Sequence, residues 1–215
     1  MKRHTSIRLR AVIATAVFLF SVHALASQTR QDAMFEFRRG NYERAVEIGL
    51  REITVNDRNM DTYVVLCMAL INLGRYEEAL RFANVARTIN RHDPRIIDIL
   101  GEIYFFMGNN GEALRYFQHS INIAPEGGHV HMAYFFIGEI FIRTGMFRHA
   151  DIALTMAVHM RPGNADWWAR LAFARENAGD LAQAVVAYER ALALNSRLTD
   201  AQRGLDRVRM ALAGR

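Results

Sequence analysis

The six residues GRYEEA, Gly74 to Ala79, belong to a phrase that begins with glycine, ends with alanine and recurs along the chain. Its five copies are Gly40–Ala45, Gly74–Ala79, Gly108–Ala113, Gly145–Ala150 and Gly179–Ala184. The glycines are 34, 34, 37 and 34 residues apart. A near-constant period of this length indicates stacked structural repeats, because one such unit is too small to bury its own apolar face.

The five copies resemble the tetratricopeptide repeat, a helix-turn-helix motif of 34 residues. When each glycine is numbered position 15 of its repeat, position 20 is alanine in every copy. Position 8 is always small: Ala33, Cys67, Gly101, Gly138 and Ala172. Glycine permits the turn after the first helix, and small residues let the paired helices approach closely. The resemblance implies an all-α solenoid of about five helix-turn-helix repeats and a C-terminal capping helix.

The repeat phase also predicts element boundaries. We expect repeats at about 27–59, 60–93, 94–127, 131–164 and 165–198, followed by a capping helix at 199–213. This gives eleven helices in an open right-handed solenoid. Pro125 and Pro162 then fall at the ends of second helices, and Pro94 opens the third repeat. The apolar stripe of the capping helix is Leu198, Ala201, Leu205, Val208 and Leu212.

Two features make individual repeats irregular. The first copy carries Glu52 at position 27, where the repeat usually has alanine. The spacing of 37 places three extra residues near Gly128, His129 and Val130, between the third and fourth repeats. We expect this longer connector to alter the angle between these two repeats.

The N-terminus has the features of a secretory signal peptide. Four Lys/Arg residues precede the apolar stretch 11–20, which is followed by Ala24-Leu25-Ala26. We therefore expect residues 1–26 to be cleaved after Ala26, leaving a domain at 27–215 that is periplasmic or secreted. The alternative is an uncleaved segment that anchors the protein in the inner membrane, the only arrangement in which we expect membrane contact.

Charge and cysteine content exclude several classes of protein. Residues 1–26 contain four Lys/Arg and no Asp/Glu, so their removal leaves 23 basic and 22 acidic residues and lowers the net charge from +5 to +1. The basic isoelectric point therefore does not support nucleic-acid binding. Cys67 is the only cysteine, so no intramolecular disulfide can form. At a small core position it is expected to pack and not to act as a nucleophile.

The family resemblance places an apolar, concave groove on the first helices. The groove positions hold Val64, Val65, Met68, Ile71, Ile99, Phe105, Phe106, Met132, Phe135, Phe136, Ile142 and Phe173. Independently of the resemblance, Tyr63 to Ile71 is an unbroken apolar run. A helix without a polar face is either buried all round or offers apolar surface to another molecule.

Polar groups in and near the groove suggest no catalytic or metal chemistry. Glu102 and Glu139 share position 9 of neighbouring repeats, where two facing carboxylates could raise a pKa or bind a cation. We expect instead that Arg143 or Arg95 pairs with them. His129 and His131 form a His-x-His pattern, with Glu126 and His119 or His149 as further ligand types. The pattern is weak, so a solvated or capping role is favoured over metal binding. We expect no catalytic residues, no metal and no cofactor.

The sequence thus predicts an exported, non-enzymatic scaffold or adaptor. Its groove would bind a helix or an extended apolar segment of a protein partner. By family analogy, this binding would support assembly of an envelope or secretion complex. Two alternatives use the same surface: a carrier of a lipid or other apolar ligand, and a homo-oligomer whose groove is filled by a second copy.

Overall fold

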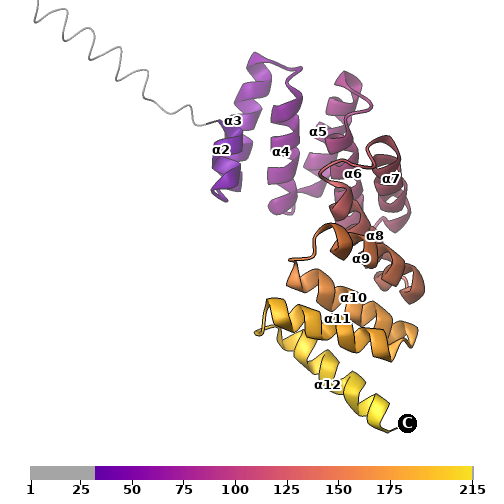
Figure 1. Cartoon of the computed structure of the whole chain (residues 1–215). Coiled ribbons are helices and arrows are strands. Elements are labelled where there is room, and N and C mark those ends of the chain that lie inside the picture. Colours follow the sequence, from indigo (N-terminus) through magenta and orange to yellow (C-terminus); the bar gives the residue numbers. More distant parts are fainter. Residues whose placement is uncertain (1–31, 215) are drawn as a thin grey trace, which may run out of the picture.

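The computed structural model describes residues 32–214, in which every regular element is a helix. The expected signal peptide and its cleavage site lie outside the described residues. In chain order the helices are α2 (Ala33–Arg38), α3 (Tyr42–Val55), α4 (Met60–Asn72), α5 (Tyr76–Ile89), α6 (Pro94–Phe106), α7 (Asn110–Ile123), α8 (Val130–Arg143), α9 (Phe147–Met160), α10 (Ala165–Ala178), α11 (Leu181–Leu194) and α12 (Thr199–Ala213). They follow one another along a curved array (Figure 1).

The helices form five antiparallel pairs, from α2 with α3 to α10 with α11, and α12 packs on the last pair. The expected all-α solenoid with a capping helix is confirmed. The recurring glycine makes the turn within each pair, because all five have φ between 71° and 86°. At Gly74 the backbone N–H donates to the Ile71 carbonyl at 2.9 Å, and that of Arg75 donates to Leu70 at 2.9 Å. These bonds satisfy carbonyls at the end of α4.

Within a pair, the small residue at position 8 lies against position 24 of the second helix. A Cβ atom on Gly101 would be 2.6 Å from the Phe117 ring, and one on Gly138 would be 2.5 Å from Leu154 Cγ. Glycine is therefore needed opposite Phe117 and Leu154. In the fifth repeat Ala172 stands at position 8 and Tyr188 at position 24, and the Tyr188 ring lies close to Gly204 of α12. The position-20 alanines are fully buried in all five pairs: Ala45, Ala79, Ala113, Ala150 and Ala184.

The first helices form the inner row of the curved array. The backbones of α2, α4, α6, α8, α10 and α12 approach one another in succession, whereas within residues 32–214 those of successive second helices stay further apart. Side chains still join α5 and α7, because the Arg87 guanidinium donates to the Tyr116 hydroxyl at 2.9 Å. Helices on the inside of a curve lie closer together than those on the outside. The inner face is the side of α2, α4, α6, α8 and α10 that points away from the second helices. The second helices α3, α5, α7, α9 and α11 form the outer row.

Two of the three extra residues lengthen the loop between α7 and α8, and the third extends the start of α8. Loop 124–129 is longer than the corresponding loops after the other repeats, which are 56–59, 90–93, 161–164 and 195–198. In addition, α8 begins one residue earlier in its repeat than α4, α6 and α10 do in theirs. Helices at the indigo end of the array stand upright in Figure 1, and those at the yellow end lie obliquely. The effect of this connector on the angle between repeats stays a prediction.

The capping helix α12 buries Ala201, Gly204, Leu205 and Val208 against α10 and α11. The expected apolar stripe stops before Leu212, which is 40% exposed in the last turn. In the part of the chain that the structure describes, no helix combines the length and apolar character needed to cross a membrane.

Candidate functional site

The predicted groove residues all lie on α4, α6, α8 and α10, but half of them are buried. Side chains with 8% exposure or less are Val64, Val65, Ile71, Ile99, Phe105 and Phe136. Met68, Met132, Phe135, Ile142 and Phe173 are half-buried, and Phe106 is 43% exposed. The buried members pack into the hydrophobic core between neighbouring repeats. The inner face therefore offers a partner fewer apolar side chains than the repeat positions alone suggest.

Aromatic side chains pack continuously along the middle of the inner face. The Phe106 ring stacks on Tyr76 with centroids 5.5 Å apart, and it meets Phe136 at 6.0 Å. Phe135 in turn contacts Phe136 at 5.7 Å and stacks on Trp167 at 4.9 Å. These contacts join four repeats, because the rings come from α5, α6, α8 and α10. They account for the burial of Phe136.

Separate pockets lie along the array. One of about 900 Å³ is at the N-terminal end and includes Val64 and Val65 in its lining. Met132 lines a pocket of about 690 Å³ beside loop 161–164, and Phe173 lines one of about 390 Å³ beside α12.

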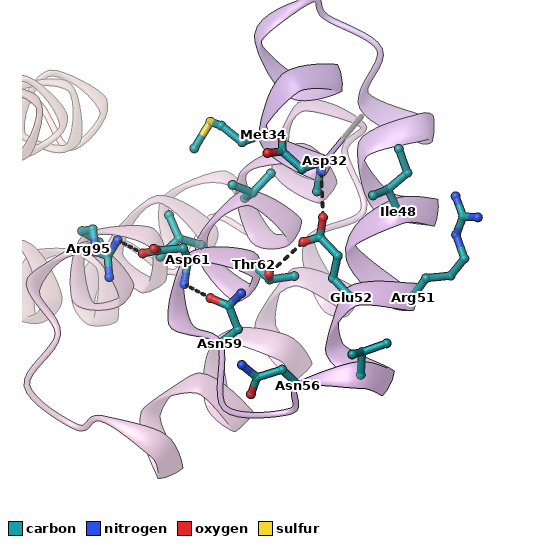
Figure 2. Close-up of a pocket in the computed structure, with 14 residues that line it drawn as sticks. Asp32, Met34, Ile48, Arg51, Glu52, Asn56, Asn59, Asp61, Thr62 and Arg95 are labelled. Atoms are coloured by element: carbon teal, nitrogen blue, oxygen red, sulfur yellow. Dashed lines mark hydrogen bonds and ion pairs between the residues drawn. The ribbon is translucent and has the colours of Figure 1, made fainter. Parts of the chain in front are cut away.

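In the N-terminal pocket, Glu52 explains the irregular first repeat (Figure 2). Its carboxylate accepts a hydrogen bond from the backbone N–H of Ala33 at 3.1 Å and another from the Thr62 hydroxyl at 2.8 Å. The first bond satisfies a free N–H in the first turn of α2, and the second connects α3 to α4. Glutamate therefore ties the short helix α2 to the next repeat, a role that alanine at this position cannot perform.

The ion pairs of the inner face differ from those expected. Glu139 accepts two hydrogen bonds from Arg170 on the next repeat, at 2.6 and 2.8 Å. Arg143 donates instead to the Phe105 carbonyl and to Asn110, both at 3.1 Å. The expected pairing of Glu102 or Glu139 with Arg143 or Arg95 is therefore wrong. The reason is geometric: position 9 of one repeat lies beside position 6 of the next, which is where Arg170 stands.

Arg95 is likewise engaged elsewhere. Its guanidinium donates to Asp61 at 2.6 Å and to Asp93 at 2.8 Å. Asp61 occupies position 2 of the preceding repeat, the same position that Arg95 takes in its own. Asp93 also caps α6, accepting from the Arg95 backbone N–H at 3.0 Å. This double use of Asp93 holds Arg95 at the N-terminal end of α6.

The acidic residues Asp98 and Glu102 lie one turn apart on α6, with the Asp98 carboxylate close to Ser120 of α7. Asp98 is 7% exposed, and neither carboxylate oxygen has a hydrogen-bond partner within the described residues. Burial raises the pKa of Asp98, while the Ser120 hydroxyl and the His129 imidazole act in the opposite direction. The Ser120 hydroxyl is near, but it does not reach hydrogen-bonding geometry. Burial and the charge of Asp98 raise the pKa of Glu102 to about 7.

We expect stability to fall as pH rises through this range. The folded pKa of Glu102 lies above its usual value of 4.5, so the native state keeps a proton that the unfolded state releases. This contribution to the free energy of unfolding is fully present below pH 4.5 and is lost as the pH rises through 7. The total loss is about 1–3 kcal/mol. Urea unfolding at pH 5 and pH 8 should show a smaller decline for Glu102→Gln than for the parent.

The control for this pH dependence is Glu126→Gln, because Glu126 is exposed in loop 124–129. This variant should follow the parent at both pH values. Equal declines for Glu102→Gln and the parent would contradict the raised pKa.

The histidines and the cysteine have surroundings that fit packing and solvation. His129 is exposed before α8 and makes no capping hydrogen bond, whereas His131 is half-buried with its ring 5.7 Å from that of Trp167. Burial, then the charges of Arg161 and His129, lower the pKa of His131. Within residues 32–214 no group of three or more His, Cys, Asp or Glu could hold a metal ion. Burial raises the pKa of the Cys67 thiol to about 12, so it stays protonated at neutral pH.

A second apolar surface lies on the outer row and was not among the predicted site residues. Ile152, Met156 and Met160 on α9 are 68%, 39% and 38% exposed. Ile152 also lines a pocket of about 410 Å³, together with Tyr134, Phe141 and others. The i, i+4, i+8 spacing of the three exposed residues is visible in the sequence and could have revealed this surface.

Comparisons with known proteins identify the repeat. Models described as tetratricopeptide repeat match residues 60–84, 94–126 and 165–197. The chain therefore contains tetratricopeptide repeats. No curated protein matches the sequence.

Solved structures share the fold at low sequence identity. The type IV pilus biogenesis factor PilW is 18% identical with a TM-score of 0.74, over 84% of this chain and 83% of that one. YrrB, described as a TPR protein with an unusual peptide-binding site, is 16% identical with a TM-score of 0.61, over 80% and 87%. A thermophilic TPR protein of Thermus thermophilus is 16% identical with a TM-score of 0.65, over 83% and 95%. At this level of identity the likeness establishes the solenoid fold alone.

Proposed function

We propose that the protein is a non-enzymatic scaffold that binds a protein partner along its inner face. The observation that carries this proposal is the line of incompletely buried apolar side chains on consecutive inner helices, centred on Phe106, which is 43% exposed beside the buried Phe105 and Phe136. Aromatic and methionine side chains on a rigid support are typical anchors for a partner helix or extended segment. The peptide-binding site named for YrrB supports this use of the fold.

The test uses a photo-crosslinking amino acid at position 106, on the inner face, and at position 152, on the outer row. Both native side chains are apolar and exposed, so the two positions form a matched pair. We expect position 106 to crosslink one defined protein in cells, and Phe106→Ser to prevent its capture when the crosslinker is moved to position 135. Crosslinking from position 152 alone would assign binding to the outer row and contradict the proposal.

Two other occupants of the inner face remain as outcomes of the same experiment. A crosslink to a second copy of this chain would indicate a self-filled homo-oligomer, and native mass spectrometry would reveal a bound lipid or other apolar ligand. Either result would replace the scaffold proposal. A monomer without ligand and without a crosslinked partner would also count against it.

We further propose that the scaffold acts outside the cytoplasm, after cleavage at Ala26, and that it supports assembly of an envelope or secretion complex. The sequence pattern of residues 1–26 supports export, and the pilus biogenesis factor among the similar structures supports an envelope role. N-terminal sequencing of the protein from cells should begin at Ser27. A protein that begins at Met1 and fractionates with the inner membrane would favour the anchored alternative, and one that begins at Met1 in the cytoplasm would refute export.

A further inference from the structure

The outer row has an open groove between α7 and α9. The backbones of these two second helices stay apart within residues 32–214, and loop 124–129 before α8 is longer than the other loops between repeats. A pocket of about 410 Å³ lies in this groove. Its lining from α8 and α9 is mostly apolar and consists of Tyr134, Ile137, Phe141, His149, Ile152 and Ala153.

Side chains of this pocket are accessible to a partner. Ile152 is 68% exposed, and Tyr134 and Phe141 are half-buried. Exposed apolar surface continues from Ile152 along α9 to Met156 and Met160. A continuous exposed apolar patch on a soluble domain is typical of an interaction site.

The α7 wall of the pocket carries two side-chain amides, Gln118 and Asn122, one helical turn apart. Both are exposed, and neither forms a hydrogen bond in the part of the chain that the structure describes. Each amide offers a donor and an acceptor, which match the C=O and N–H of a peptide main chain. Residues four apart on a helix are separated by about 6 Å along its axis, and alternate residues of an extended chain by about 6.6 Å. The two amides therefore have the spacing needed to bond one edge of an extended chain.

We infer that the groove between α7 and α9 binds an extended segment of a partner protein, with its main chain hydrogen-bonded to Gln118 and Asn122. Side chains of an extended segment point alternately to its two faces, so every second side chain faces α8. One of these is apolar and enters the pocket beside Tyr134 and Ile152. The pocket volume lies near the lower end of the roughly 300–1,000 Å³ found for small-ligand sites, which suits one bulky side chain. This site is separate from the inner face and goes beyond the function proposed above.

An extended segment fits this groove better than other occupants. A helix uses its main-chain N–H and C=O groups internally, so it would leave both amides without main-chain partners. A second copy that presents its own outer row would meet this one mainly along a single helix, because both rows lie on the outside of a curve. Such a contact is small beside the roughly 800 Å² per partner that a stable interface buries, and it would leave the pocket empty.

The experiment measures the binding of fluorescein-labelled nine-residue peptides by fluorescence anisotropy. The probes alternate leucine, phenylalanine or tryptophan with serine, threonine or glutamate, so that each has one apolar face when extended. The parent protein is compared with Gln118→Ala/Asn122→Ala and with Gln183→Ala, which removes an exposed amide from α11. We expect the double variant to bind the best peptide at least about 10-fold more weakly, because the hydrogen bonds of both amides are lost. Gln183→Ala should bind it as the parent does.

Methylated copies of the best peptide test the main-chain bonds directly. N-methylation removes a backbone donor and leaves the side chain unchanged, and alternate residues of an extended chain direct their N–H groups to opposite edges. One copy is methylated at two alternate residues near its centre, and the other at the residues next to them. We expect one copy to bind the parent at least about 10-fold more weakly than the other. Equal binding of the two copies would overturn the inference.

The remaining outcomes separate this inference from the proposed function. Binding that persists in the double variant but is lost in Phe106→Ser would place the peptide on the inner face, which overturns the inference and supports the proposed function. Failure of every peptide to bind would overturn the inference alone, because the crosslinking test at position 106 does not depend on these peptides. Self-association of the parent that the double variant abolishes would identify a second copy as the occupant and also overturn it.

Side-chain amide signals in NMR spectra give a readout independent of affinity. The ¹H–¹⁵N signals of Gln118 and Asn122 should shift when the best peptide is added, whereas that of Gln183 should not. The double variant should keep the circular dichroism spectrum of the parent, because both positions are exposed and alanine favours helix. A bound peptide that leaves the Gln118 and Asn122 signals unchanged would overturn the inference.

Discussion

Phe136→Ala should lower the free energy of unfolding by about 3–5 kcal/mol, the range for removing a large buried aromatic side chain. The Phe136 side chain is 7% exposed. Its ring lies 5.0 Å from that of Phe105, 5.3 Å from Phe117 and 5.7 Å from Phe135, measured between centroids. Truncation would leave a cavity where α6, α7 and α8 meet. Urea unfolding followed by circular dichroism measures the loss.

The matched control is Phe106→Ala, which removes the same number of atoms from the neighbouring inner helix. Phe106 is 43% exposed, so less than half of the loss at Phe136 is expected. If both variants lost the same free energy, Phe136 would not be a core residue. The comparison also decides how the inner face should be probed, because a double change of Phe135 and Phe136 would damage the fold along with any binding surface. Phe106 is the position at which binding can be removed with the least loss of stability.

The fold could be predicted because its determinants are local and repeat at a fixed spacing. Glycine at position 15 adopts positive φ in all five copies, and alanine at position 20 is buried in each. These residues act within one helix pair, so a single repeat defines their role and five copies define the array. The three extra residues around the start of α8 were located from the glycine spacing for the same reason.

The burial of the predicted groove could not be read from one repeat. The positions of Phe105 and Phe136 within their repeats correctly predict that both lie on inner helices. Their exposed fraction, however, depends on how α6 and α8 approach each other. The aromatic side chains are large enough to reach from one repeat to the next, so they fill space between the repeats that smaller side chains would leave open. Burial at such positions is a property of neighbouring repeats together.

The ion pairs follow a spacing that is visible in the sequence. Arg95 pairs with Asp61, Arg170 with Glu139 and Arg207 with Glu176, and each pair is separated by 34 or 31 residues. Charges one repeat apart, or three residues short of one repeat, lie side by side on adjacent helices. Applying this rule to Glu139 would have identified Arg170 as its partner. The same rule finds no basic residue at 31 or 34 positions after Asp98, which is followed there by His129 and Met132.

Gly138→Val should cost about 3 kcal/mol or more, because the helix pair α8 and α9 has no space for a side chain at this point. A Cβ atom there would lie 2.5 Å from Leu154 Cγ and 2.8 Å from Leu154 Cδ2. Leu154 is fully buried, so it cannot turn away into solvent. The control is Gly111→Val in the first turn of α7, where an added Cβ meets only the Asn109 side chain, at 3.9 Å. That variant should stay within about 1 kcal/mol of the parent.

A double variant tests whether positions 8 and 24 are matched in size. Where position 8 is Ala33 or Cys67, position 24 is small, Gly49 or Ala83, whereas Gly138 faces a leucine. The fifth repeat differs, because Ala172 is matched with Tyr188, whose ring lies close to Gly204 of α12. Leu154→Ala alone should cost about 2–5 kcal/mol by leaving a cavity. Combined with Gly138→Val, the new side chain fills that cavity, so the double variant should be more stable than the sum of the two losses predicts by at least about 1 kcal/mol. Strict additivity would mean that the two helices move apart to relieve the contact, and that glycine is not required by the size of Leu154.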